Sequence, residues 1–412
     1  MRVLFTPFPA KAHVYNMAPL IWAMRNAGHE VRIAAQPNPA EPNALSSAGL
    51  SAHQAGKPLN WEQRTEEGGG EYTEEELALI AEFPIAQIDE EKITPEYAEV
   101  IFDIWAPLCE AMAGPDVTAD LVEFAREWKP DLVVWDALVY AGPVAAKACG
   151  AAHARLLMGS DNFGRMRKAL QEQQRDPMRD WLTGKLGEFG LEFDEDVVLG
   201  QLTIDAMPAC TRYETDAKTL PVRFTPYNGP SESPKWLRDK PTKPRVCVTV
   251  GLSARENEIP NKDDGFDAAE LFEAVRGLDV EVVATLQTEN APENVRLVDF
   301  VPLNELLPSC AVVVHHGGTG TIGNAVVHGV PQLVIPGSTW GEATAAHELE
   351  KAGAALTLRP EEFSAQALRE RLVRLLEDKS FVDSAAAVRA EMLGRPTVND
   401  VVLDLEKLAA SR

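Results

Sequence analysis

The residues best suited to chemistry follow a short apolar run in the last third of the chain. Residues 311–314, Ala-Val-Val-Val, have the composition of a buried parallel strand. His315 and His316 come next, and Gly317 and Gly318 would let a ligand approach the backbone closely. A helix that opens after the glycines offers N–H groups and the positive end of its dipole, which suit a phosphate. The pattern predicts a turn that holds a diphosphate, with a histidine adding a hydrogen bond.

The same stretch contains a competing motif. Gly318, Gly320 and Gly323 have the spacing of a dinucleotide-binding fingerprint, and Glu342 follows about 20 residues later. In that fingerprint the acid normally ends the second strand, whereas here a Pro- and Gly-containing segment separates Glu342 from the strand-like residues 333–335. The histidine pair also stands where the fingerprint has ordinary strand residues. The pattern therefore favours a diphosphate site over a dehydrogenase.

A second set of chemical groups is expected in the first half of the chain. His13 follows the apolar segment 3–8, and Asp136 ends the apolar segment 130–136. Both would lie at the carboxyl ends of parallel strands, where such sheets bind ligands. A carboxylate beside a neutral imidazole fixes its tautomer, so the two would form a general-base dyad. On position alone, His13 as a surface residue and Asp136 as a helix N-cap remain alternatives.

The strand and helix patterns that position these groups start twice along the chain. The first series is strand 3–8, helix 16–27 and strand 31–35, and it closes with strand candidates around Thr211 and Val222. The fold class expected is α/β, with two Rossmann-like doubly wound parallel sheets facing across a cleft. The expected parts are a first domain at 1–225, a linker at 226–244, a second domain at 245–395, and a terminal helix at 396–412 that packs back toward the first domain.

Composition and charge restrict the function classes. The 412 residues suffice for about two or three domains. A net charge of −24 repels nucleic acids and anionic membranes, and no apolar run is long enough to cross a bilayer, so neither partner is expected and a cytoplasmic location is. The cysteines have neither disulfide nor metal spacing, which predicts reduced thiols at Cys109, Cys149, Cys210, Cys247 and Cys310.

Segments along nearly the whole chain resemble one enzyme family. They include FPAKAHVYNMAPL at 8–20, KPDLV at 129–133, YNGP at 227–230, HHGGTG at 315–320 and HGVPQ at 328–332. These segments are similar to those of actinobacterial natural-product glycosyltransferases, above all the erythromycin desosaminyltransferase group, which acts on macrolides and anthracyclines. The resemblance implies the GT-B fold and transfer of a sugar from a nucleotide donor, with inversion at the anomeric carbon, in antibiotic biosynthesis.

The resemblance also implies roles for individual residues. His13 would deprotonate the acceptor hydroxyl, and Asp136 would support it. His316 would contact the donor diphosphate, and Thr321 would bind phosphate. The expected donor-binding residues are Gly251, Ser253, Val301, His316, Gly317, Gly318, Thr319, Gly320, Thr321, Trp340, Gly341 and Glu342. Hydrogen-bond donors preset around the leaving diphosphate can stabilise it without a metal, so neither a metal nor another cofactor is expected, and the dTDP-sugar is a co-substrate.

Two departures from the family pattern stand out. Relatives often carry an acid–Gln pair that binds sugar hydroxyls, whereas this chain has Glu342 followed by Ala343. Fewer polar contacts suit a sugar with fewer hydroxyls, which predicts a deoxysugar donor, and the resemblance implies that its nucleotide is dTDP. Asn324 stands where many relatives place an acid.

The acceptor is expected to be a lipophilic polyketide bound by loops of the first half. The candidate acceptor residues are Trp61, Phe83, Trp105, Tyr140 and Phe163. The resemblance adds two candidate partners, a cytochrome P450-like activator protein and a second copy of the chain. Two other functions fit the same fold: a sugar-nucleotide epimerase and a non-catalytic sugar-nucleotide-binding protein.

Overall fold

The computed structural model describes residues 1–60, 88–170, 175–251, 267–286, 288, 291–337 and 341–411. The chain divides into two compact units. Unit 1 comprises Met1–Ala206, Tyr213–Val222 and Pro396–Arg412, and unit 2 comprises Met207–Arg212 and Arg223–Arg395. Residues 226–244, expected as a linker, therefore belong to unit 2, and the terminal segment 396–412 belongs to unit 1.

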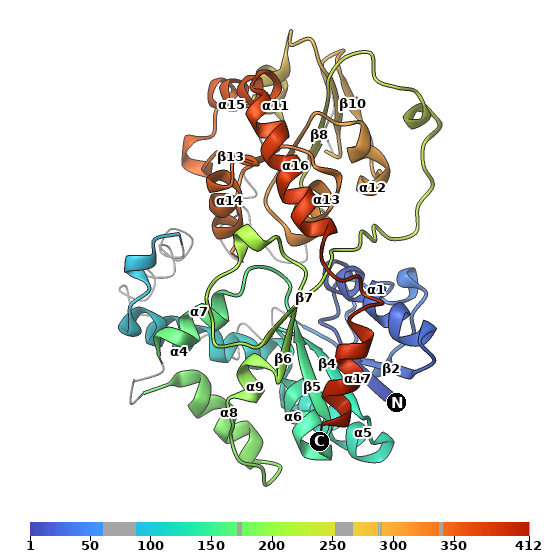
Figure 1. Cartoon of the computed structure of the whole chain (residues 1–412), viewed down its shortest axis with the longest axis vertical. Coiled ribbons are helices and arrows are strands. Elements are labelled where there is room, and N and C mark those ends of the chain that lie inside the picture. Colours follow the sequence, from blue (N-terminus) through green and yellow to red (C-terminus); the bar gives the residue numbers. More distant parts are fainter. Residues whose placement is uncertain are drawn as a thin grey trace. The chain divides into compact units, whose positions relative to one another are not determined.

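Unit 1 is built on a parallel sheet whose described strands have the order β3-β2-β1-β4-β5-β6-β7. The strands are β1 (Arg2–Thr6), β2 (Glu30–Ala35), β3 (His53–Gln54), β4 (Leu132–Asp136), β5 (Ala152–Leu156), β6 (Leu202–Asp205) and β7 (Thr219–Pro221). Its helices, shown in Figure 1, are α1 (Lys11–Asn26), α4 (Pro95–Met112), α5 (Pro115–Trp128), α6 (Ala141–Cys149), α7 (Asn162–Ala169), α8 (Pro177–Gly187), α9 (Asp196–Leu199) and α17 (Val402–Ala410).

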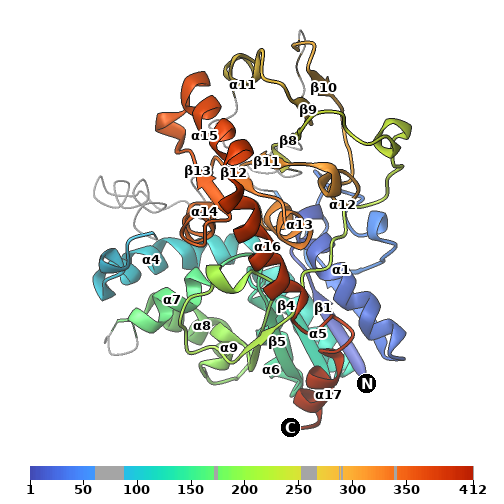
Figure 2. The ribbon, with the colours of Figure 1, turned by 45° about the horizontal axis from the view of Figure 1, so that its top comes forward.

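Unit 2 repeats this architecture with the described strand order β10-β9-β8-β11-β12-β13, again parallel. The strands are β8 (Arg245–Thr249), β9 (Glu281–Ala284), β10 (Val295–Leu297), β11 (Val312–His315), β12 (Gln332–Val334) and β13 (Ala355–Thr357). The helices are α11 (Ala268–Val275), α12 (Leu303–Leu306), α13 (Thr319–His328), α14 (Glu342–Lys351), α15 (Ala365–Glu377) and α16 (Lys379–Leu393). Helix α13 follows β11 along the chain, and both are labelled in Figure 2.

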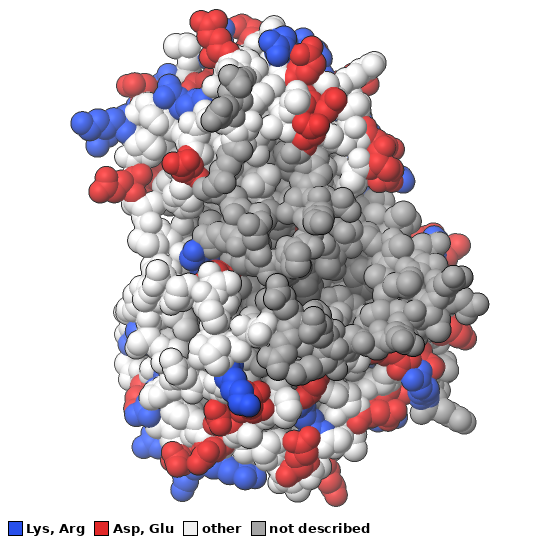
Figure 3. Space-filling view, turned by 180° about the vertical axis from the view of Figure 1, so that it is seen from behind, with Lys and Arg blue, Asp and Glu red and all other residues white. Residues whose placement is uncertain are grey.

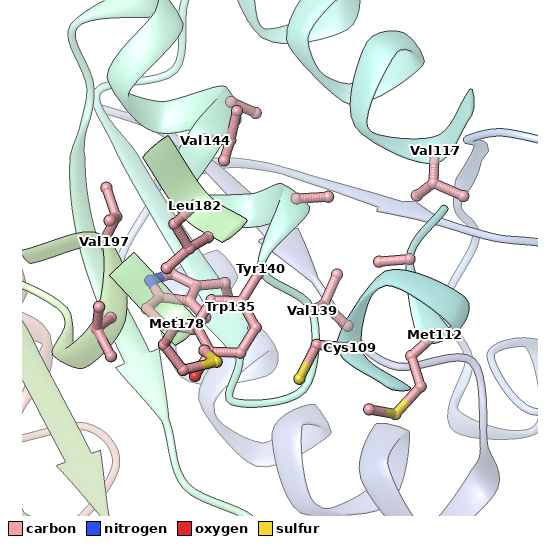
Figure 4. Packing of buried hydrophobic residues seen from close by; sticks show 14 of the residues in the cluster. Cys109, Met112, Val117, Trp135, Val139, Tyr140, Val144, Met178, Leu182 and Val197 are labelled. Carbon is pink, nitrogen blue, oxygen red and sulfur yellow. The ribbon is translucent and has the colours of Figure 1, made fainter. Parts of the chain in front are cut away.

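The cores explain why these apolar segments became strands. All five residues of β4 are buried, as expected when helices cover both faces of a parallel sheet. Figure 4 shows the Trp135 and Tyr140 rings among Met178, Leu182 and Val197, which come from α8 and α9. The centroids of the Trp135 and Tyr140 rings are 5.5 Å apart. This layer fixes the end of β4, where Asp136 lies.

The terminal helix α17 packs within unit 1. It lies beside β5, as Figures 1 and 2 show. Leu405 is fully buried, and the Glu406 carboxylate lies 3.0 Å from Nε2 of His29. A segment that follows all of unit 2 in the sequence therefore completes unit 1.

Two local predictions were wrong. Helix α1 begins at Lys11, not Asn16, because the buried Glu41 carboxylate accepts a hydrogen bond from the Lys11 N–H at 2.7 Å and caps the earlier start. Thr211 was expected in a strand but lies in a short 3-10 turn that follows Pro208. The strand that precedes this turn is β6, which ends at Asp205. A proline cannot donate a ladder hydrogen bond, so it interrupts strand pairing there.

The next features are the charged side chains of the surface and the state of the cysteines, which were predicted to be reduced thiols. Figure 3 shows acidic and basic side chains mixed on the described part of one face. All five cysteines are free thiols. Among the described residues, no helix has the length and apolar character needed to cross a membrane, and no three His, Cys, Asp or Glu side chains gather as a metal-binding group would.

Candidate active site

His13 and Asp136, predicted as a dyad, are in direct contact. The Nδ1 atom of His13 lies 2.8 Å from Oδ2 of Asp136. His13 is in the first turn of α1, and Asp136 ends β4, whose neighbour in the sheet is β1. The N–H of Leu138 donates to Oδ1 of Asp136 at 3.0 Å, which fixes the carboxylate on its other side. Helix α6 starts only at Ala141, with Tyr140 as its N-cap, so Asp136 is not a helix cap.

This geometry determines which nitrogen of His13 can act as a base. An ionised carboxylate only accepts hydrogen bonds, so Nδ1 of His13 carries the proton and Nε2 has the lone pair. The His13 side chain keeps 19% of its surface exposed, whereas the Asp136 side chain has none. Burial by itself lowers the pKa of His13, but the charges of Asp136 and Glu41 and the hydrogen bond to Asp136 outweigh it and raise the pKa above its ordinary value.

Glu41 belongs to this group and was not predicted. It is 3% exposed, and its Oε2 caps the first turn of the helix that carries His13. Its Oε1 is buried, and no described residue forms a hydrogen bond with it. Glu41 lies in a polar loop with no periodic pattern, so only its contact with α1 reveals it.

The second group surrounds the turn between β11 and α13. Gly251, after β8, has a φ of +78°, and a Cβ placed on it would lie 2.5 Å from Cε1 of His316. A Cβ on Gly318 would lie 2.8 Å from Nε2 of the same ring. The His316 imidazole is thus held between two glycine backbones, so residues with side chains are excluded from both positions.

His316 is neutral at physiological pH and incompletely satisfied. Burial lowers the pKa of its ring to about 4. Its Nδ1 is buried and has no hydrogen-bond partner among the residues that the structure describes. A neutral imidazole carries one N–H, which can be donated to an anion. Beyond it lies the N-terminus of α13, the positive end of the helix dipole, where the N–H groups of Thr321 and Ile322 both donate to the Gly318 carbonyl oxygen at 3.0 Å.

Other predicted donor residues gather at the same turn. Gly317 has a φ of +99°, and a Cβ there would lie 2.9 Å from the Glu342 Cβ, so Glu342 covers this glycine at the start of α14. Gly341, just before it, is left-handed with a φ of +85°. Thr321, within α13, is 6% exposed. Glu342 begins a helix instead of ending a strand, which removes the dinucleotide fingerprint as an interpretation.

Val301 lies beside a hollow in unit 2. Its side chain is 2% exposed and packs in a core cluster with Leu306, which leaves its backbone for any ligand contact. The adjoining hollow has a volume of about 830 Å³ and includes the ring of Phe300, which is 38% exposed. The residues that line it are Pro234, Trp236, Leu286, Thr288, Leu297, Val298, Asp299 and Phe300.

Asn324, a departure from the family pattern, joins α13 to a distant segment. Its Nδ2 donates to the Gly320 carbonyl oxygen at 2.7 Å, and its Oδ1 accepts from Nδ2 of Asn228 at 3.4 Å. Oδ1 of Asn228 in turn accepts from the Asn304 N–H at 2.9 Å. A carboxylate at position 324 could not donate to Gly320, which explains an amide here.

Of the predicted acceptor residues that the structure describes, two are buried and one is partly buried. Tyr140 is 1% exposed and Trp105 is 7% exposed. Phe163 is partly buried, and its ring centroid lies 5.4 Å from that of Trp105. Trp105 and Phe163 thus form one aromatic contact, while Tyr140 is a core residue of the α8 layer. Trp61 and Phe83, and the donor candidates Ser253 and Trp340, lie outside the described residues.

Comparisons with known proteins agree over the full length. Aclacinomycin-T 2-deoxy-L-fucose transferase of Streptomyces galilaeus is 46% identical over 429 residues, covering 100% of this chain and 96% of that protein. The 10-deoxymethynolide desosaminyltransferase of Streptomyces venezuelae is 40% identical and covers 100% and 97%. The crystal structure of the glycosyltransferase VinC in complex with DTDP superposes with a TM-score of 0.85 at 39% identity and covers 100% of both chains.

The two doubly wound sheets and these neighbours define a glycosyltransferase of the GT-B fold. Residues 22–251 match the N-terminal domain model of the erythromycin biosynthesis protein CIII-like family, and residues 269–408 match its C-terminal domain model. The chain therefore belongs to this family.

Proposed function

We propose that this protein is an inverting glycosyltransferase that moves a deoxysugar from a dTDP-sugar to a hydroxyl of a lipophilic polyketide in antibiotic biosynthesis. The names of the relatives support this: they include transferases of deoxy-L-fucose and desosamine, and a tylactone mycaminosyltransferase. The observation that carries the proposal is the 2.8 Å contact between His13 and Asp136 beside the carboxyl ends of β1 and β4.

The proposed reaction uses Nε2 of His13 as general base. Nε2 takes the proton of the acceptor hydroxyl while its oxygen attacks the anomeric carbon of the donor. The bond between that carbon and the diphosphate oxygen breaks, the configuration inverts, and the diphosphate leaves with the electron pair. Asp136 keeps Nδ1 protonated and stabilises the imidazolium that forms.

We assign the diphosphate to the turn between β11 and α13. The His316 imidazole would donate a hydrogen bond to the oxygens on which negative charge develops, and the positive end of the α13 dipole would add to their stabilisation. We propose that these groups suffice, so that the enzyme uses neither a metal nor another cofactor. The nucleotide base is assigned to the hollow beside Val301, where the half-exposed Phe300 offers a ring face for stacking.

The proposal of a deoxysugar donor rests on the residues at the start of α14. Glu342 lies over Gly317 and can accept a hydrogen bond from one sugar hydroxyl. Ala343 is buried and has no polar group in its side chain. A fully hydroxylated hexose would lose water at this position without a matching acceptor, which costs binding energy. The test is a panel of dTDP-deoxyhexoses and UDP-hexoses with macrolide and anthracycline aglycones, read by mass spectrometry. Preference for a UDP-hexose would contradict this assignment.

The His13→Ala variant separates the proposed function from the two alternatives. We expect sugar transfer to fall by about 10²–10⁴-fold, because the base is removed, with dTDP affinity unchanged. An epimerase would consume the donor without any aglycone. A non-catalytic binding protein would form no glycoside, whether or not His13 is present.

The activator protein and the homodimer stay predictions. We expect a purified chain with low transfer activity to gain activity when a cytochrome P450-like activator is added. Size-exclusion chromatography with light scattering tests the homodimer.

A further inference from the structure

His315, the first histidine of the pair, has a role of its own. Its side chain is fully buried at the end of β11. The N–H of Gly317 donates to Nδ1 of this ring at 3.0 Å, and Nε2 lies 3.0 Å from Oε1 of Gln332 on β12. Because Nδ1 accepts from a backbone N–H, it carries no proton. Nε2 therefore has the N–H and donates it to Gln332, so both ring nitrogens are satisfied in a single tautomer.

These contacts orient the backbone of the turn between β11 and α13, which we call the donor turn because it is proposed to bind the sugar donor. Gly317 has a φ of +99°, and its N–H points inward to His315. The Ile335 N–H donates to the His315 carbonyl oxygen at 2.8 Å, and the Gly337 N–H donates to the His316 carbonyl oxygen at 3.3 Å. The strand β12 and the residues after it thus hold both histidines through the backbone, and the imidazole of His315 adds a side-chain link to Gly317.

We propose that His315 is a positioning residue of the donor site, whose ring, anchored by Gln332, holds the Gly317 N–H inward and thereby sets the orientation of His316 and the first turn of α13. This role rests on the proposed function of the turn as the diphosphate site. It removes Gly317 from the predicted N–H donors to the diphosphate, because its N–H is already used. The diphosphate is then left to the His316 ring and to the positive end of the α13 dipole.

The protonation state of His315 suits this role. Burial lowers the pKa of the ring to about 3, with a further contribution from His316, while the bond to Gln332 acts in the opposite direction. A protonated ring would place a second N–H against that of Gly317 and break the link. Since the ring stays neutral, the turn keeps its shape across the pH range in which His13 titrates.

The test uses His315→Leu and His315→Asn. Leucine fills the apolar space but cannot accept a hydrogen bond, whereas the Asn side-chain oxygen can take the position of Nδ1. We expect dTDP to bind His315→Leu at least about tenfold more weakly, and His315→Asn to recover most of that loss. Calorimetry with dTDP gives the affinities, and steady-state kinetics should show a higher donor KM with the acceptor KM unchanged.

Matched variants make the outcome decisive. His328→Leu alters another histidine at the far end of α13 and should leave dTDP affinity unchanged. If His315→Leu does not fold, Gln332→Met tests the same link with the ring retained, and we expect weaker dTDP binding there too. A folded His315→Leu that binds dTDP like the wild type, or an Asn variant no better than Leu, overturns the positioning role. Failure of the wild-type enzyme to bind dTDP would instead overturn the assignment of the turn itself.

Discussion

At the scale of single residues, the site depends on carboxylates placed around one imidazole. Asp136 fixes the tautomer of His13 through Nδ1, and Glu41 adds a second negative charge without a contact to the ring that the structure records. The two acids thus differ in function. Asp136 orients the ring of the proposed base, and both acids raise the pKa of His13. Because the base must be neutral to accept a proton, activity should increase as pH rises through the raised pKa of His13.

The variants Asp136→Asn and Glu41→Gln separate these effects. Removing either charge lowers the pKa of His13, so the acid limb of the profile of kcat/KM against pH should move to lower pH in both. In Asp136→Asn we also expect the plateau to fall by about 10²–10⁴-fold, because the tautomer is no longer enforced. In Glu41→Gln the plateau should stay close to wild type. An acid limb that does not move in either variant would contradict His13 as the titrating base.

At the scale of elements, Gly251 after β8 and the turn after β11 fit together through glycine and histidine. The His316 ring occupies the space where a Cβ of residue 251 would lie, so the two strand ends are constrained as a pair. The helix that follows is held on its other side, because Gly323 lies against the Phe224 ring and Asn324 bonds to Asn228. The donor turn is therefore fixed by segments from three parts of unit 2.

The substitution Gly251→Ala tests this fit. Alanine at a φ of +78° costs about 1–2 kcal/mol in backbone strain, and its Cβ also displaces His316. Gly277→Ala is the matched control, since Gly277 has a φ of +71° with nothing within 4 Å of an added Cβ. We expect similar losses in the free energy of unfolding from strain, but weaker dTDP binding only in Gly251→Ala. Equal dTDP affinities in the two variants would show that the displaced ring does not matter.

At the scale of the whole molecule, the C-terminal segment of the chain belongs to unit 1 and not to unit 2, which precedes it in the sequence. Helix α17 follows unit 2 in the sequence but buries Leu405 in unit 1, next to β5. The first unit therefore reaches its full stability only when the C-terminal residues are present.

Two leucines of α17 provide a matched comparison. Leu405 is fully buried, whereas Leu403 is 59% exposed. We expect Leu405→Ala to lower the free energy of unfolding by about 2–5 kcal/mol, through lost burial and the cavity left behind. Leu403→Ala should change it by no more than about 0.5 kcal/mol. Urea denaturation followed by circular dichroism measures both, and equal effects would place α17 away from the core.

The sequence by itself determined the elements and the residue types of the site. Apolar runs such as 246–248 and 312–314 became the centres of buried strands, because parallel strands covered by helices need continuous apolar residues. The position of a polar residue after such a run fixes the sheet edge at which it lies. His13 and Asp136 could therefore be predicted at the same edge, although helix α1 begins earlier than its apolar pattern indicates.

The tertiary structure decided which of these groups meet. Strand β1 pairs with β4 across more than a hundred residues of intervening chain, and this pairing brings Asp136 within hydrogen-bond distance of His13. Glu41, Gln332 and Asn228 reach their sites through long-range contacts, which leave no periodic signal in a sequence. Tyr140 is an aromatic residue of the kind that lines binding sites, yet its packing against Trp135 makes it part of the core. A local pattern encodes which face of an element is apolar, whereas contacts between elements depend on strand order and on the shapes that pack together.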